Sequence, residues 1–362
     1  MISCQNAIVE NVDALVIINY RTAIDKLFFY FTPVRSGVFE NSAIIVTPNE
    51  KILLTSKLEF ETAQSELKDV QCYRYERIFD LLPNIAEHLK DYPKVGLNFE
   101  KIPYAAYSHL KKLVTRHSTS IEFIDLSTEL MTARMVKTKE EVEKIQKACD
   151  ITVQVANEIP SYAHPNEMTI AAHIEFNMRK RGATSTWFST IVAIGPNSAD
   201  PHYTTGDRPS KSGEYLLTDF GAEYARYNAD LTRTFIFDKA DPKAKKIYDL
   251  VLQAQLEAMD AIHAGVAAKE IDAIARNRIE EHYPGRFIHS LGHSLGLEVH
   301  DGGGLNRYSD LVLEPGMVFT VEPGVYLRDY GGVRIEDDIV VTKNGFKLLT
   351  PEKKEEIIEI KL

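Results

Sequence analysis

Short apolar runs alternate with helical patterns in the first third of the chain. Apolar residues recur at helical spacing over 80–90 and 104–115, while the intervening runs are short enough to be buried strands. These runs are 14–18, 42–47, 51–55 and 94–97. An alternation of strands and helices predicts an α/β domain.

A different pattern begins in the middle of the chain. Residues 138–159 predict a long amphipathic helix with several glutamates in its first turns, where the helix dipole favours negative charge. We place the domain boundary near Ser127, which gives domains of 1–128 and 129–362. The second domain has further helical patterns and then becomes rich in strands, so we expect an α+β domain with its antiparallel strands late in the chain. The further helices are expected at 169–181, 242–263 and 268–282.

Length and composition limit the classes of protein that fit. The chain of 362 residues exceeds the usual span of one hydrophobic core, which favours two domains. Its 42 basic and 52 acidic residues give a net charge of −10, and the basic residues are scattered, so a nucleic-acid partner is disfavoured. Apolar runs stay far below the roughly 20 residues that cross a bilayer, so we expect no membrane span.

The cysteines and the N-terminal residues bear on the compartment. Cys4, Cys72 and Cys149 are odd in number and widely spaced, which suits reduced thiols with structural roles. The N-terminus has no basic segment leading into an apolar run, as a secretory signal would. We therefore expect a cytoplasmic protein.

Two aspartates stand where strands should be apolar. Residues 215–220 and 229–237 predict the strands of a hairpin, joined by 221–228. Symmetry about positions 224 and 225 would place Asp219 opposite Asp230, and directly opposed like charges destabilise a sheet. Two solvent-facing aspartates are the alternative, but their apolar and threonine-rich neighbours disfavour it.

Two glutamates repeat this pattern later in the chain. Glu322 and Glu336 would oppose each other in a second hairpin that is symmetric about Asp329. Four carboxylates gathered in one cleft would repel one another strongly unless cations were bound. The pattern therefore indicates two divalent metal ions if the hairpins converge, and their convergence is left open by the sequence.

Three histidines fall within twelve residues. His289, His293 and His300 are interleaved with Gly292 and Gly296, which permit close approach of the backbone. The cluster favours His293 as a nitrogen ligand. An alternative is a mononuclear zinc site with His289 and His293 on one helix, but Gly292 disfavours a helix and no H-E-x-x-H motif is present.

These segments together resemble the pita-bread metallopeptidases, the family of methionine aminopeptidase, aminopeptidase P and prolidase. The matching motifs occur in the family's order. They include Pro201-His202-Tyr203, Asp219-Phe-Gly-Ala, Asp230-Leu-Thr-Arg-Thr, Gly292-His293-Ser-Leu-Gly-Leu-Glu-Val-His300, Val321-Glu322-Pro-Gly-Val-Tyr and Arg334-Ile-Glu336-Asp-Asp. The resemblance implies an α+β pita-bread catalytic domain preceded by an α/β creatinase-like N-terminal domain, which favours aminopeptidase P and prolidase.

The resemblance also implies roles for individual residues. Two divalent metal ions per chain would be held by Asp219, Asp230, His293, Glu322 and Glu336. This oxygen-rich set suits Mn²⁺ or Co²⁺, with Zn²⁺ as a further option. Glu322 would also be the general acid and base, while His202 and His300 would bind the substrate carbonyl and the tetrahedral intermediate. His289 and Arg334 would lie beside the cluster, and Thr232 would support Asp230.

The implied function is hydrolysis, by metal-activated water, of the bond between a first residue and proline in short peptides. The enzyme would be a metallo-exopeptidase, an Xaa-Pro aminopeptidase or Xaa-Pro dipeptidase, and a homodimer. Two rival functions are a metal-free pseudo-enzyme that binds peptides or proteins and a creatinase-like C–N hydrolase, both disfavoured by the complete ligand set.

The resemblance bears on substrate length as well. Prolidases carry an arginine four residues after the histidine that matches His300, where it can bind the free carboxylate of a dipeptide. Here that position is Gly304. We therefore expect Xaa-Pro-Xaa tripeptides to be cleaved at least as efficiently as Xaa-Pro dipeptides.

Overall fold

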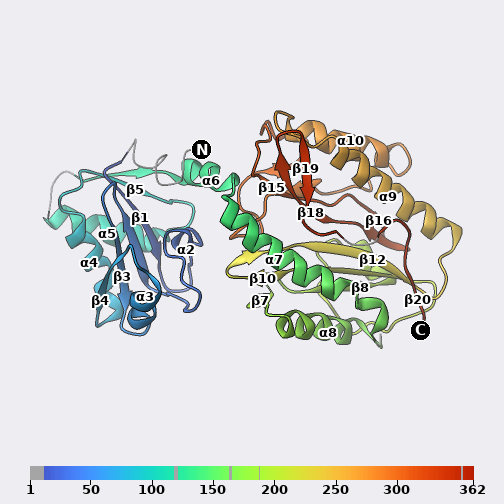
Figure 1. Cartoon of the computed structure of the whole chain (residues 1–362), viewed down its shortest axis with the longest axis horizontal. Helices are drawn as coiled ribbons and strands as arrows, with labels where there is room; N and C mark the ends of the chain where they lie inside the picture. The colour runs from blue at the N-terminus through green and yellow to red at the C-terminus, as the bar shows by residue number, and fades with distance from the viewer. Residues whose placement is uncertain (1–11, 118–120, 163–164, 187, 352–353) are drawn as a thin grey trace. The chain divides into compact units, whose positions relative to one another are not determined.

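The computed structural model describes residues 12–117, 121–162, 165–186, 188–351 and 354–362. The chain divides into two compact units, Met1–Arg134 and Met135–Leu362 (Figure 1). The expected boundary at residue 128 falls within helix α6 (Ser127–Met135), close to this division. Cys4 lies outside the described residues.

The first unit is built on a mixed sheet of six strands in the order β4-β3-β2-β1-β5-β6. Its strands are β1 (Ala14–Asn19), β2 (Ser42–Val46), β3 (Lys51–Ser56), β4 (Gln71–Tyr75), β5 (Lys94–Leu97) and β6 (Glu122–Asp125). Its helices are α2 (Leu27–Phe31), α3 (Phe60–Glu66), α4 (Leu81–His88), α5 (Tyr104–His117) and α6, with a 3₁₀ turn at Ile78–Asp80. The alternation of strands and helices predicted from the sequence is confirmed.

Apolar side chains on both faces of this sheet are buried. Leu15 and Ile17 of β1 join one core with apolar residues of α2, α3 and α6. Val16 and Ile18, on the opposite face, join a second core with α4 and α5. Helices thus cover both faces, which explains why β1 is apolar at successive positions instead of alternating.

The second unit contains two helix pairs around several small sheets (Figure 1). Its helices are α7 (Lys139–Ala156), α8 (Glu167–Lys180), α9 (Pro242–Asp260) and α10 (Ala268–Glu280), with 3₁₀ turns at Ile159–Ser161 and Gly195–Ala199. Thr138 begins α7 with a capping box to Glu141, and Asp241 caps α9 by accepting a hydrogen bond from the Ala244 N–H. Across the described part of the chain, no helix has the length and apolar character needed to span a membrane.

Three sheets of this unit frame the site, and each packs against one of the helix pairs. A four-stranded sheet, β20-β12-β9-β8, shares a core with α7 and α8, while strands β15 to β18 share another core with α9 and α10. The strands up to β12 are β7 (Ser185–Thr186), β8 (Ile191–Ile194), β9 (Tyr215–Phe220), β10 (Ala222–Tyr224), β11 (Tyr227–Asn228) and β12 (Leu231–Phe237). The later strands are β13 (Gly292–His293), β14 (Gly304–Leu305), β15 (Val318–Val321), β16 (Gly324–Leu327), β17 (Gly331–Arg334), β18 (Asp337–Thr342), β19 (Gly345–Leu348) and β20 (Glu359–Ile360).

The first acidic hairpin forms, but its register differs from the prediction. Asp219 of β9 pairs with Thr232 of β12, not with Asp230. The turn lies at Ala225 and Arg226, whose φ angles of 49° and 71° are both left-handed, as a two-residue hairpin turn requires. This turn is one position later than expected, so every cross-strand partner moves by two residues. A shift of two leaves Asp219 and Asp230 on the same face of the sheet.

The register of the second acidic hairpin is confirmed. Val321 pairs with Asp337 and Gly324 pairs with Arg334, so the partners are symmetric about residue 329 as predicted. Glu322 and Glu336 lie opposite each other in the short gap between the β15–β18 and β16–β17 ladders. Neither glutamate belongs to a strand.

Candidate metal centre

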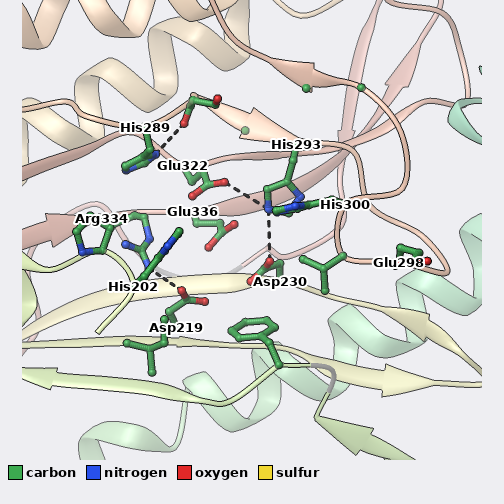
Figure 2. Close-up of a pocket in the computed structure, with 18 of the residues that line it drawn as sticks. His202, Asp219, Asp230, His289, His293, Glu298, His300, Glu322, Arg334 and Glu336 are labelled. Atoms are coloured by element: carbon green, nitrogen blue, oxygen red, sulfur yellow. Dashed lines mark hydrogen bonds and ion pairs between the residues drawn. The ribbon is translucent and has the colours of Figure 1, made fainter. Parts of the chain in front are cut away.

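The five expected ligands converge on one cavity of about 700 Å³ in the second unit. Figure 2 shows their side chains turned toward a common space. They come from separate segments: Asp219 from β9, Asp230 from just before β12, His293 from β13, Glu322 from after β15 and Glu336 from before β18. The hairpins therefore converge, which the sequence left open.

Distances within this cluster suit a bound cation better than hydrogen bonds. The Nε2 atom of His293 lies 3.6 Å from Asp230 Oδ2 and 3.5 Å from Glu322 Oε1, which is too long for hydrogen bonds. One ligand atom each from Asp230, His293 and Glu336 lie within 4.8 Å of one another. A buried carboxylate oxygen on Asp219 and another on Asp230 have no hydrogen-bond partner among the described residues. This oxygen-rich set of unsatisfied atoms fits a divalent metal ion.

The electrostatics of the cluster point the same way. Burial raises the pKa of Asp230 and that of Glu336 well above the usual range, and neighbouring carboxylates raise both further. Burial also raises the pKa of Asp219, and it raises that of Glu322 to about 7. The pKa of His293 is lowered to about 4 by burial and by His300. The raised pKa values make protonation of these carboxyl groups more favourable in the absence of a cation, and bound metal would supply positive charge in place of those protons.

Arg334 connects two of the ligands. Its guanidinium donates from Nη2 to Asp219 Oδ2 at 2.6 Å and from Nε to Thr232 Oγ1 at 2.9 Å. The Thr232 hydroxyl in turn donates to Glu336 Oε2 at 2.6 Å. Thr232 therefore supports Glu336, and the hydrogen bonds described for its hydroxyl do not include Asp230, the ligand that it was expected to support. One cation thus orients carboxylates from both hairpins.

Tyr326 extends this network to His289. Arg334 Nη1 donates to the Tyr326 hydroxyl at 2.9 Å. His289 Nδ1 lies 2.8 Å from the Ser290 carbonyl, so it must donate there, and Nε2 accepts from the Tyr326 hydroxyl at 2.8 Å. Burial and the charge of Arg334 lower the pKa of His289 to about 3, which agrees with a neutral ring. His289 lies outside any helix and is held by Tyr326, so the mononuclear helical zinc site is not formed.

His202 and His300 line the same cavity and are both exposed. Neither ring makes a hydrogen bond to another residue within the described ranges. The ring centroid of His300 lies 4.3 Å from that of His293, at the edge of the ligand cluster. Two imidazoles that border the carboxylate cluster and keep their nitrogens available can bind a ligand in the cavity.

A buried ion pair fixes the loop that carries His300. Lys137 Nζ lies 3.3 Å from Asp301 Oδ2, and the exposed fractions of these side chains are 0% and 8%. Asp301 Oδ2 also accepts a hydrogen bond from the Leu297 N–H at 3.2 Å. Sequence reasoning missed this pair.

Asp338 positions the backbone of one ligand. Its Oδ2 atom accepts hydrogen bonds from the Asp230 N–H at 2.9 Å and from the Cys149 thiol at 3.3 Å. Burial raises the pKa of Asp338 to about 8. Cys149 is buried and Cys72 partly buried, both as free thiols, which agrees with the expected reduced state. The sequence carried no signal for these contacts, because Asp230 and Cys149 lie 108 and 189 residues before Asp338 in the chain.

Known proteins match both units. Residues 143–343 match Metallopeptidase family M24, and residues 7–136 match the Creatinase/Prolidase N-terminal domain. An Xaa-Pro dipeptidase of Pyrococcus furiosus is 36% identical over 359 residues, which cover 96% of this chain and 99% of that protein.

Solved structures agree with this assignment. The X-Pro aminopeptidase of Thermotoga maritima superposes with a TM-score of 0.89 at 31% identity, covering 98% of this chain and 99% of that one. The Xaa-Pro dipeptidase of Bacillus anthracis gives a TM-score of 0.88 at 32% identity and covers 98% of each chain. The expected fold, a pita-bread catalytic domain after a creatinase-like domain, is confirmed. The chain belongs to Metallopeptidase family M24 and carries the Creatinase/Prolidase N-terminal domain.

Proposed function

We propose that the protein hydrolyses the bond between the first residue of a short peptide and a proline at the second position. One observation carries this proposal: four carboxylates and His293 converge on one cavity, and the nearest cation, Arg334, leaves oxygens of Asp219 and Asp230 unsatisfied. The named activities of the similar enzymes from Pyrococcus furiosus and Thermotoga maritima support it.

The five clustered residues would hold two divalent ions, Mn²⁺ or Co²⁺ by the chemistry of the donors, with Zn²⁺ as a further option. Such ions supply a hydroxide near neutral pH and polarise the scissile carbonyl. Hydrogen-bonding groups around the cluster hold the ligands in place. Arg334 orients Asp219, Thr232 orients Glu336, and the Asp338 carboxylate anchors the Asp230 backbone.

Glu322 is the proposed general base and acid. Its carboxyl group borders the cavity beside the other proposed ligands, where it can take a proton from water and return it to the leaving nitrogen. The Thr320 hydroxyl donates to Glu322 Oε1 at 3.1 Å and accepts from the His293 N–H at 3.1 Å. Thr320 therefore fixes the base relative to the histidine ligand.

His202 and His300 are the proposed donors to the substrate carbonyl oxygen as negative charge develops on it. Their rings border the cavity without internal hydrogen bonds, so their N–H groups can reach a ligand. An Xaa-Pro bond is a tertiary amide that has no N–H. A site organised around the amine and carbonyl therefore accepts a bond that proteases recognising the N–H handle poorly.

Substrate length follows from the residue at 304. Gly304 pairs with His293 in the β13–β14 ladder, and a β-carbon there would lie only 3.0 Å from the Gly292 carbonyl oxygen. A carboxylate-binding arginine at this position is absent from the chain. We propose that Xaa-Pro-Xaa tripeptides are cleaved at least as efficiently as Xaa-Pro dipeptides, by a cytoplasmic homodimer.

The direct test is hydrolysis of Ala-Pro, Ala-Pro-Ala, Ala-Ala and Met-Ala by protein loaded with Mn²⁺, Co²⁺ or Zn²⁺. We expect the two proline peptides to be cleaved in preference to Ala-Ala and Met-Ala. Equal or faster cleavage of Met-Ala would contradict the proline specificity. A kcat/KM for Ala-Pro more than tenfold above that for Ala-Pro-Ala would contradict the proposed length preference alone.

A further inference from the structure

A second cavity of about 610 Å³ opens beside the metal cavity. The two cavities share the wall formed by Phe188, Ile191 and His202. Ile191 pairs with Asp219 across β8 and β9, so this shared wall begins next to a proposed metal ligand. A substrate bound at the metals can therefore extend into the second cavity.

The walls of the second cavity combine apolar side chains with one acid. Met168 of α8, Phe188 and Tyr203 supply apolar or aromatic surface, and Glu175 of α8 supplies a carboxylate. Glu175 is half-buried and makes no hydrogen bond or ion pair with any residue that the structure describes. Tyr203, by contrast, has its hydroxyl committed to the buried Glu167 at 2.9 Å. The cavity thus offers a carboxylate without a described partner among apolar and hydroxyl-bearing side chains.

A smaller cavity on another wall of the site has the opposite charge. This cavity of about 310 Å³ is lined by Arg307 and by Arg276, whose charge is already paired with the buried Asp272, and it shares His289 and Ser290 with the metal cavity. A peptide carries its positive charge at the amino end and its negative charge at the carboxyl end. Charge complementarity therefore directs the first residue toward Glu175 and the rest of the peptide toward Arg307.

We propose that the Glu175 cavity receives the side chain of the substrate's first residue and favours lysine or arginine there. This inference rests on the proposed Xaa-Pro activity and names the substrate class within it. The aliphatic stem of either side chain fits along Met168 and Phe188, and its cationic head reaches the Glu175 carboxylate.

The test compares kcat/KM for Arg-Pro, Ala-Pro and Glu-Pro in the wild type and in Glu175→Gln. We expect the wild type to prefer Arg-Pro, and Glu175→Gln to lower kcat/KM for Arg-Pro about tenfold, the size of one charge-assisted hydrogen bond. Ala-Pro should stay within about twofold. The matched control is Asp207→Asn. Asp207 is an exposed acid that follows the lining residues 202–205 in the chain but does not itself line the cavity.

Two results would overturn the assignment: an Arg-Pro to Ala-Pro ratio that Glu175→Gln leaves unchanged, or an equal loss in Asp207→Asn. If the wild type cleaves no Xaa-Pro peptide, the proposed activity fails separately. In that case, calorimetry of Arg-Pro and Ala-Pro binding to the inactive protein tests whether the Glu175 cavity binds the first side chain. Tighter binding of Arg-Pro that Glu175→Gln abolishes supports it, and equal binding refutes it.

Discussion

Glu336 and Asp337 are adjacent and both buried, but their pKa values are shifted in opposite directions. Asp337 accepts from Arg233 at 2.8 Å and from the Thr350 hydroxyl at 2.9 Å, and it also contacts Lys354. Burial alone would raise the pKa of Asp337, but Arg233 and Lys354 hold it below the usual value. Glu336 has a pKa well above its usual value because of burial and nearby carboxylates.

The difference separates structural carboxylates from functional ones. The chain supplies the cations for Asp337, so this group is complete as folded. Glu336 accepts one hydroxyl, from Thr232, and faces other acids across the cavity. A buried carboxylate without its own cation costs free energy that a bound metal can offset, so such groups mark the place where metal binds.

The largest effect is expected at Glu322, which belongs to the metal-dependent group. Glu322→Ala removes both a ligand and the proposed base, so kcat/KM of the metal-loaded protein should fall by about 10⁴-fold or more. Glu322→Gln is the control that keeps the shape of the side chain. Activity within about twofold of the wild type in either variant would remove Glu322 from the mechanism.

Substitution of Lys354 tests Asp337, the carboxylate that the chain's own cations neutralise. Lys354→Met leaves the buried Asp337 with one cation fewer, which should lower the free energy of unfolding by about 3 kcal/mol. Denaturant unfolding of the catalytic unit measures this loss, and metal content measured in parallel should stay at the wild-type value. Loss of metal without loss of stability would mean that Asp337 belongs with the ligands.

His300 belongs neither to the proposed metal ligands nor to the residues that pair with Asp337. His300→Ala should lower kcat about 10²-fold by removing a donor to the developing oxyanion. Metal content should not change, because His300 is not one of the five proposed ligands. Elemental analysis that shows metal loss would instead make His300 a ligand.

The pH dependence of stability should differ between the metal-free and metal-loaded protein. In the metal-free fold, Asp230, Glu322 and Glu336 hold protons that the unfolded chain releases above pH about 4.5. The folded state therefore binds more protons, so the stability of the metal-free protein falls as pH rises from about 5 through 7. Metal replaces these protons, so the rise in Tm produced by Mn²⁺ should be larger at pH 8 than at pH 5.5. A metal-free Tm that climbs over this interval would contradict the assignment.

The two acidic hairpins show how much of the strand register could be predicted from the sequence. The second hairpin is symmetric about Asp329, and its register followed directly from the paired motifs. The first turns at Ala225 and Arg226, and neither residue type favours the left-handed conformation that both adopt. The resulting error of two positions kept the acidic side chains on one face, so Asp219 and Asp230 still line the same cavity, although Asp219 lies opposite Thr232 and not Asp230.

The supporting contacts were beyond the sequence for a different reason. Lys137 and Asp301 are 164 residues apart, and no local pattern links them. Tyr326 was part of a family motif, but its place between Arg334 and His289 depends on how two hairpins pack. Chemistry-bearing residues could be found because their charge conflicts with a strand, whereas residues that position them agree with their surroundings.

The number of metal ions bound per chain tests the central claim most directly. After removal of metal with a chelator and dialysis against Mn²⁺ or Co²⁺, elemental analysis should find about two ions per chain in the wild type and in Lys354→Met. Glu336→Ala should bind fewer, because it removes one of the carboxylates that the fold leaves without a cation. A wild-type protein that binds no metal, or that is fully active after exhaustive chelation, would contradict the account.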